Sequence, residues 1–241
     1  MIANLAYVDA VVVNAAQKIA SSECSVTPLH DPAHHYCRLS IEVDMNARET
    51  SEIASRLRPY PFERALFLVG EQNAGKSVQL RSMFRDFRLG REGIVPEKVN
   101  LPEMYRLSNE RILYLRLSSP HEKGETIDDN EHENYLDKTV RKFAKESSYA
   151  RRWNFAGALQ PNAARNMPDA AATVEAFVAR LEPERVRVVF LSPDRTGALL
   201  QQHHLKLAAR LRTIDSVEVC WIDARDREAN GLYLADFFDF S

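Results

Sequence analysis

The sequence predicts an α/β fold, built as a mostly parallel sheet with helices on both faces. Five short apolar runs follow Pro61, and segments with helical spacing separate them. The runs lack strict alternation, so they are typical of strands that are buried on both faces. Strands that alternate with helices indicate parallel pairing through crossover helices. The predicted strands are 65–70, 111–117, 153–160, 185–192 and 217–223.

Three helices between these strands are predicted from apolar residues spaced at i, i+3, i+4 and i+7. Gly90 suits the end of the first helix, because glycine readily adopts the left-handed conformation that follows a helix. Asp169 is expected to be the N-cap of the second helix. The predicted helices are 76–90, 169–181 and 198–211. The apolar face of the first consists of Leu80, Met83, Phe84 and Phe87.

Composition indicates a globular protein with an ordinary core. The chain has 241 residues, of which 45% are hydrophobic and 27% charged, and its net charge of −2 gives no indication of nucleic-acid binding. No apolar run approaches the ~20 residues of a membrane-spanning helix, so no membrane association is expected. Three cysteines without a secretory leader favour free thiols and a cytoplasmic location.

The sequence divides at about residue 60. Residues 1–60 are predicted to form an N-terminal extension with a helix (2–20), a strand (36–44) and a second helix (47–57). Residues 61–241 are predicted to form a nucleotide-binding domain. The aromatic C-terminal segment, 231–241, is expected to pack against this domain.

The stretch "GEQNAGKS", residues 70–77, carries the most specific chemistry. It follows a predicted strand and begins a predicted helix, which is the context that a phosphate-binding loop requires. Gly70 and Gly75 let the backbone turn and approach phosphates closely, and backbone N–H groups and the helix N-terminus attract the anion. Lys76, expected to be exposed in the loop, can reach the β and γ phosphates, and Ser77 can bind Mg²⁺ through its hydroxyl.

On this motif the chain resembles the P-loop nucleoside triphosphatase superfamily. The resemblance implies a bound nucleoside triphosphate and Mg²⁺. It assigns the cofactor-binding role to the loop and the residue after it, and we add Arg195, which follows a strand end. An N-K-x-D element for guanine is not evident, which favours ATP. The cofactor-binding residues are therefore Gly70, Glu71, Gln72, Asn73, Ala74, Gly75, Lys76, Ser77, Val78 and Arg195.

One expected acid is missing. Members of the superfamily usually carry a carboxylate at the end of the third core strand, but here that strand ends in Gln160 and Pro161. Other strands are followed by Glu122, Asp194 and Asp223, and the carboxyl ends of parallel strands gather at one edge of the sheet. We predict that Asp194 and Ser77 bind the metal.

The predicted catalytic residues are Lys76, Asp194, Glu122 and Gln160. A glutamine near the γ phosphate can orient an attacking water, although a residue that simply caps the strand end is the favoured explanation of Gln160. An arginine such as Arg195 can neutralise phosphate charge. His203 and His204 lie in the third predicted helix, and one is expected to face its apolar side without a catalytic role.

Three functions remain open from the sequence. The first is a Mg²⁺-dependent ATPase that regulates or supplies energy to a partner protein or homo-oligomer. The second is a small-molecule kinase of the nucleotide or nucleoside type, for which Glu122 and Glu125 offer acceptor-binding carboxylates. The third is a nucleotide-binding structural subunit with little turnover, which the strand that ends in Gln160 would suit.

Overall fold

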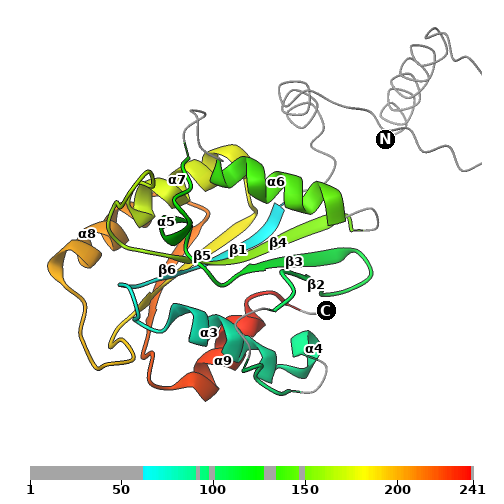
Figure 1. Cartoon of the computed structure of the whole chain (residues 1–241), viewed down its shortest axis with the longest axis horizontal. Helices are drawn as coiled ribbons and strands as arrows, with labels where there is room; N and C mark the ends of the chain where they lie inside the picture. The colour runs from blue at the N-terminus through cyan, green and yellow to red at the C-terminus, as the bar shows by residue number, and fades with distance from the viewer. Residues whose placement is uncertain (1–61, 91–92, 98–100, 128–133, 147–149, 240–241) are drawn as a thin grey trace, which may run out of the picture. The chain divides into compact units, whose positions relative to one another are not determined.

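The computed structural model describes residues 62–90, 93–97, 101–127, 134–146 and 150–239, all within one compact unit (Figure 1). The predicted extension at 1–60, with its helices and strand, lies outside the described residues.

The domain is built on one sheet of six strands in the order β2-β3-β4-β1-β5-β6. Strand β1 is central and pairs in parallel with β4 on one side and β5 on the other. Strands β3 and β6 continue the parallel sheet outward, and only β2 is antiparallel, at the edge beside β3. The strands are β1 (Phe62–Val69), β2 (Met104–Arg106), β3 (Arg111–Arg116), β4 (Arg152–Leu159), β5 (Arg185–Leu191) and β6 (Val217–Ile222).

All five strands predicted from the sequence are present, and their ends lie within three residues of the predicted ones. Strands β1, β3, β4 and β5 are buried along nearly their whole length, as expected for strands covered on both faces. The short strand β2 was not predicted, because three residues carry too little pattern to recognise.

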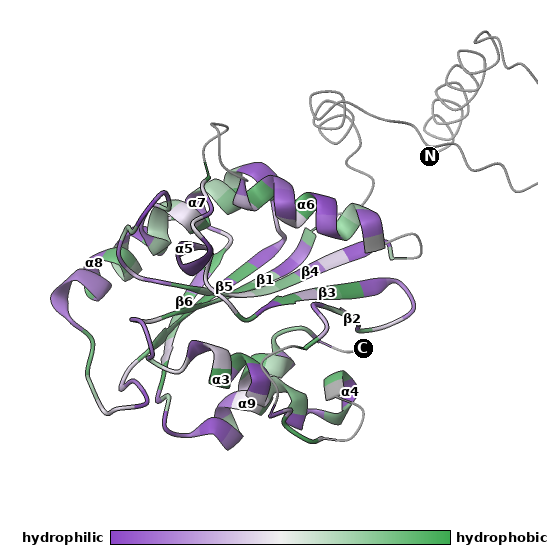
Figure 2. Ribbon diagram, in the orientation of Figure 1, coloured by the Kyte–Doolittle hydropathy of each residue, from purple (hydrophilic) through white to green (hydrophobic). Residues whose placement is uncertain are grey.

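Helices cover both faces of the sheet, which confirms the predicted α/β class (Figure 1). Helices α5, α6, α7 and α8 lie on one face, and α3, α4 and α9 lie on the other. The helices are α3 (Lys76–Ser82), α4 (Phe87–Gly90), α5 (Pro120–Lys123), α6 (Tyr135–Glu146), α7 (Ala170–Leu181), α8 (Gln202–Leu211) and α9 (Arg227–Asp236). Figure 2 shows hydrophobic residues in the strands and mixed, partly hydrophilic helices around them.

The helix predicted at 76–90 is interrupted. Helix α3 ends at Ser82, the 3₁₀ turn Met83–Arg85 follows, and Asp86 adopts an extended conformation before α4. The carboxylate of Asp86 accepts a hydrogen bond of 2.9 Å from the backbone N–H of Arg88, so it favours a new helix start over continuation. Phe87, predicted on the buried face, is therefore 70% exposed.

The other two predicted helices are present. Asp169 is the N-cap of α7, as predicted, and accepts a hydrogen bond of 2.8 Å from the N–H of Ala172. Helix α8 begins at Gln202, later than the predicted residue 198, because Ala198 and Leu200 belong to the loop after β5.

The C-terminal segment packs against the domain as expected, and most of it belongs to helix α9. Phe238 is fully buried. A Cβ atom on Gly231 would lie 2.2 Å from the carbonyl oxygen of Ser82, so only glycine allows α9 to lie this close to α3. The position of α3, which follows the predicted phosphate loop, thus depends on α9.

No helix among the described residues is both long enough and apolar enough to cross a membrane.

Candidate functional site

The stretch 70–77 lies where the strand order of the sheet reverses. Helix α3, which follows β1, lies on one face, whereas α7, which follows β4 and leads to β5, lies on the other (Figure 1). In open α/β sheets, ligands bind in the crevice outside the carboxyl ends of the strands at such a reversal. The predicted loop follows β1 directly, so the topology places it at the expected edge.

The loop backbone turns sharply at two residues. Asn73 has φ of 65° and Gly75 has φ of 105°, both in the left-handed region, so carbonyls and N–H groups turn in different directions. Among the described residues, the N–H groups of Gly75, Lys76 and Ser77 donate no hydrogen bond to another group. These three consecutive donors are available to a ligand at the start of α3.

Lys76 is buried, with 6% of its surface exposed, which corrects the expectation that it is exposed in the loop. Its ammonium donates hydrogen bonds of 2.7 Å to the carbonyl oxygens of Gly70 and Glu71, so the side chain folds back over the loop. Burial lowers the pKa of Lys76 to about 8, and the carboxylates of Glu122 and Glu71 act in the opposite direction.

Ser77, the predicted metal ligand, joins the loop to β3. Its hydroxyl donates a hydrogen bond of 2.9 Å to the carbonyl oxygen of Leu117, the residue after β3. A serine hydroxyl also carries lone pairs, so Ser77 can still coordinate a cation through the same oxygen. Val78, the predicted cofactor-binding residue after the loop, faces a pocket on the flank of α3.

The remaining loop residues divide into a buried and an exposed group. Ala74 is buried, and its N–H donates a hydrogen bond of 3.1 Å to the carbonyl oxygen of Glu71, which closes the turn. Gln72 and Asn73 are exposed at the tip, where they can contact a ligand or solvent. Gly70 continues the sheet with a weak hydrogen bond of 3.4 Å from its N–H to the carbonyl oxygen of Leu159.

Arg195, predicted to neutralise phosphate charge, contacts the loop. Its backbone N–H donates a hydrogen bond of 3.2 Å to the carbonyl oxygen of Ala74. The aliphatic part of the Arg195 side chain packs against Gly75. If Gly75 carried a Cβ atom, it would lie 3.4 Å from Cβ of Arg195. Arg195 is exposed, and its guanidinium has no ion-pair partner within the described part of the chain.

Asp194 is the residue before Arg195, and its carboxylate accepts several hydrogen bonds from residues of its own loop. Oδ1 accepts hydrogen bonds from the N–H and hydroxyl of Thr196 (2.8 and 2.7 Å) and from the N–H of Ala198 (2.9 Å). Partial burial raises the pKa of Asp194, but these hydrogen bonds outweigh it and the pKa is lowered. The arrangement holds the loop that carries Arg195, and Oδ2 is the atom left for a metal.

Glu122 is exposed at the start of α5, and its charge acts on Lys76. The short helix that carries it is held from both sides. The side chain of Arg165 donates a hydrogen bond of 2.8 Å to the carbonyl oxygen of Glu122. Nε2 of the buried His121 lies 2.8 Å from the carbonyl oxygen of Pro168. Of the carboxylates predicted near the metal, Glu122 is the one linked electrostatically to the loop lysine.

His121 has a defined tautomer. A carbonyl oxygen can only accept, so Nε2 carries the proton, and Nδ1 accepts from the Ser119 hydroxyl at 3.1 Å. Burial lowers the pKa of His121, and the charge of Lys76 acts in the same direction. Through these two hydrogen bonds, the neutral imidazole connects the segment after β3 to the loop before α7. The sequence places His121 after a strand but gives no sign of this contact.

Gln160 follows β4, the strand that pairs directly with β1. It is partly buried, and its amide has no hydrogen-bond partner among the residues that the structure describes. Glu125 and Asp223, by contrast, are engaged elsewhere. Glu125 is buried and forms an ion pair of 2.6 Å with Arg116, whereas a hydrogen bond from Arg225 lowers the pKa of Asp223 to about 2.

Glu71 meets two histidines that the sequence reasoning did not connect with the loop. Its Oε1 lies 3.5 Å from Nε2 of His203 and 3.4 Å from Nε2 of His204. His204 is buried, as expected for one of the pair. More than 130 positions separate these histidines from Glu71, and no spacing rule connects them.

The Glu71–His203–His204 group has the atoms for a metal site but not the tautomer. Nδ1 of His204 accepts a hydrogen bond of 3.0 Å from the backbone N–H of Gln201. The neutral ring therefore carries its proton on Nε2, the atom that faces Glu71. A metal-binding histidine uses an unprotonated nitrogen and usually donates through the other. The group fits a hydrogen-bonded support for the loop better than a zinc site.

No model of a known protein family matches this chain, and no curated protein matches its sequence.

Proposed function

We propose that the chain binds ATP with Mg²⁺ through residues 70–77 and acts as a Mg²⁺-dependent ATPase that works with a partner protein or a second copy of itself. One observation carries the proposal: a G-x-x-x-x-G-K-S stretch stands between β1 and α3 with three unpaired backbone N–H donors at its end. Phosphate-binding loops depend on such donors, followed by a lysine that reaches the phosphates.

The residues around the loop support specific roles. Lys76 would exchange its two carbonyl partners for phosphate oxygens, and Arg195 would add a second positive charge from the loop after β5. Mg²⁺ would be held by Ser77 and by phosphate oxygens, with Glu122 or Asp194 as the carboxylate or water-mediated ligand. Mg²⁺ supplies neutralisation of the charge that develops during phosphoryl transfer.

A nucleotide-binding subunit with little turnover is a second candidate, and Gln160 favours it. The strand beside β1 ends in an uncharged amide, so the usual carboxylate is missing where a neighbour of the loop would supply it. The kinase alternative loses one of its two acceptor carboxylates, because Glu125 is buried and paired with Arg116.

Equilibrium binding tests the shared part of these proposals. Titration calorimetry with ATP and with GTP, each with Mg²⁺, should give saturable ATP binding and a rise in melting temperature. A ligand that binds only the native state stabilises by about 2.7 kcal/mol at a hundredfold excess over Kd. Absence of binding for both nucleotides would overturn the proposal, and a preference for GTP would reverse the choice of base.

Turnover then separates the functions. Phosphate release without an acceptor, increased by proteins that co-purify with the chain, supports the ATPase. Retention of ATP without phosphate release supports the structural subunit, and turnover only with an added acceptor supports the kinase.

A further inference from the structure

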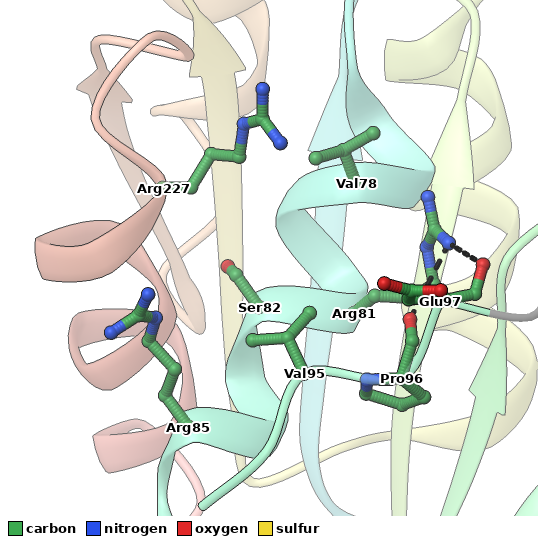
Figure 3. A pocket seen from close by; sticks show the side chains of 8 residues that line it. All are labelled: Val78, Arg81, Ser82, Arg85, Val95, Pro96, Glu97 and Arg227. Atoms are coloured by element: carbon green, nitrogen blue, oxygen red, sulfur yellow. Dashed lines mark hydrogen bonds between the residues drawn. The ribbon is translucent and has the colours of Figure 1, made fainter.

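A pocket of about 350 Å³ lies on the flank of α3, away from the phosphate loop's own donors. It is bounded by α3, by the N-terminal end of α9 and by the segment 93–97 (Figure 3). Arg227 extends from α9 toward α3, and Glu97 lies on the opposite side with Arg81. Pockets that bind small molecules have volumes of roughly 300–1,000 Å³, so this one fits a small ligand and not a macromolecule.

Positive charge dominates the lining of this pocket. Three arginines, Arg81, Arg85 and Arg227, and one carboxylate, Glu97, are among the residues that line it. Arg227 has no hydrogen-bond or ion-pair partner among the described residues, and a guanidinium is always charged near neutral pH.

The other two arginines are held in place without full loss of their charge. Arg81 donates to the carbonyl oxygens of Glu97 (2.8 Å) and Ser77 (3.3 Å), which are neutral acceptors and leave the guanidinium charge uncompensated. Arg85 pairs with Glu228 at 2.6 Å, but that carboxylate is 74% exposed, and exposed pairs are weak. The pocket therefore attracts an anion.

One part of the wall is apolar. Val78 on α3 and Val95 and Pro96 on the neighbouring segment line it, and their side chains offer contact to carbon and not to water. A bare inorganic anion would leave this wall unused. A ligand with a phosphate at one end and a small organic part at the other would satisfy both the guanidinium groups and the apolar wall.

We propose that this pocket binds a small organic phosphate, with Arg227 and Arg81 on the phosphate and Val78 and Pro96 against the organic part. Arginine is suited to this because its planar fork matches phosphate oxygens in a bidentate manner. The site is separate from the phosphate loop, although Arg81 contacts the carbonyl of Ser77 and so connects the two.

The test uses the full chain with Lys76→Ala, so that phosphate binding at residues 70–77 is weakened in every variant compared. Phenyl phosphate is the probe and phenol is the uncharged control, both titrated by calorimetry. We expect saturable binding of phenyl phosphate only, weakened at least tenfold when Arg227→Ala is added. Arg227 is exposed and unpaired within the described chain, so this change should leave the melting temperature unchanged.

A matched control is Arg180→Ala on α7, across the sheet from the pocket, which removes the same charge and should leave binding unchanged. Three outcomes would overturn the proposal: no saturable binding, equal affinity with and without Arg227, or equal weakening by Arg180→Ala. The result does not depend on the ATP proposal, because Lys76 is replaced throughout.

Discussion

The ammonium of Lys76 lies 2.7 Å from the carbonyl oxygen of Gly70, the first residue of the loop to which Lys76 itself belongs. The lysine thus closes the loop on itself, buried and with a pKa lowered to about 8. A triphosphate would bring negative charge to this ammonium and favour its protonated form. Nucleotide binding and protonation of Lys76 are therefore coupled.

The first prediction follows from this coupling. With a pKa lowered to about 8, a fraction of the Lys76 side chains is neutral at pH 8, and binding should protonate them. We expect ATP binding to take up a measurable fraction of a proton at pH 8, and the affinity to fall as the pH rises further. Calorimetry in buffers of different ionisation enthalpy measures this uptake.

Lys76→Ala is the control for this prediction. It should remove the proton uptake and weaken ATP binding ten- to a hundredfold or more, since a charge-assisted contact contributes roughly 1.5–3 kcal/mol. Unchanged uptake in Lys76→Ala would mean that another group binds the proton. Unchanged affinity would remove Lys76 from the site.

The second prediction concerns the loop backbone. Gly75→Ala places a Cβ on a residue with φ of 105°, which costs about 1–2 kcal/mol, and brings it to 3.4 Å from Cβ of Arg195. We expect ATP affinity to fall at least tenfold. Gly124→Ala is the matched control, because Gly124 also has a positive φ (68°) but nothing within 4 Å of the added Cβ.

Both glycine variants should lose a similar amount of stability, as measured by urea unfolding, while only Gly75→Ala should lose nucleotide affinity. If the two lose affinity equally, the effect comes from general destabilisation and not from the loop. That result would count against residues 70–77 as the binding site.

Five of the strands and the helices α7 and α8 could be predicted because their signals are local. Apolar runs identify β1, β3, β4, β5 and β6, and the spacing around Val174 and Phe177 identifies α7. The break after Ser82 could not be predicted from periodicity, because Phe84 and Phe87 continue the helical pattern while Asp86 ends it through one side-chain contact.

The candidate site shows the same division. The loop is a contiguous motif, so its position after β1 and before α3 could be predicted from the sequence. The contacts of Glu71 with His204 and of Lys76 with the charge of Glu122 join segments that are distant along the chain. Such contacts depend on tertiary structure, and a single sequence carries no pattern for them.

The third prediction distinguishes two roles for Asp194. If its carboxylate only holds the loop, Asp194→Asn should preserve most ATP affinity, because an amide oxygen can still accept from Thr196 and Ala198. Asp194→Ala should then weaken ATP binding several-fold, equally with and without Mg²⁺, by releasing Arg195. We expect this pattern, measured by calorimetry under both conditions.

A metal-binding Asp194 would behave differently. Asp194→Asn would then reduce affinity or turnover only when Mg²⁺ is present, because the amide retains the shape but loses the charge. Such a selective loss would contradict the loop-holding role and assign Asp194 to the metal.

The fourth prediction concerns Glu122. Its charge raises the pKa of Lys76, so Glu122→Gln should lower that pKa below about 8 and increase proton uptake on ATP binding at pH 8. If Glu122 also holds Mg²⁺, turnover should fall by orders of magnitude while metal-free ATP binding survives. Calorimetry and a phosphate-release assay give the two readouts.

Glu184→Gln is the control for Glu122, because Glu184 is exposed and its N–H bonds the carbonyl of Phe62 at the opposite edge of the sheet. It should change neither readout. Unchanged proton uptake in Glu122→Gln would show that Glu122 does not act on Lys76. Unchanged turnover in both Glu122→Gln and Asp194→Asn would exclude both carboxylates as essential metal ligands.

The fifth prediction tests how α9, and through it α3, is held. Arg111 is buried at the start of β3, where its Nε donates 2.7 Å to Glu63 and its other nitrogens donate to the carbonyls of Phe238 and Asp239. Arg111→Leu would leave the buried Glu63 carboxylate without its main partner and the end of α9 without its donors. Breaking a buried pair in this way typically costs about 3–5 kcal/mol.

Urea unfolding should therefore show a loss of about 3–5 kcal/mol for Arg111→Leu. Arg180→Leu, which removes an exposed pair of 3.5 Å with Asp137, should cost less than about 1 kcal/mol. The double variant Glu63→Leu/Arg111→Leu should recover part of the loss, because it removes the uncompensated charge. If Arg111→Leu costs no more than Arg180→Leu, the buried pair does not hold α9, and the support of α3 must come from the contact between Gly231 and Ser82.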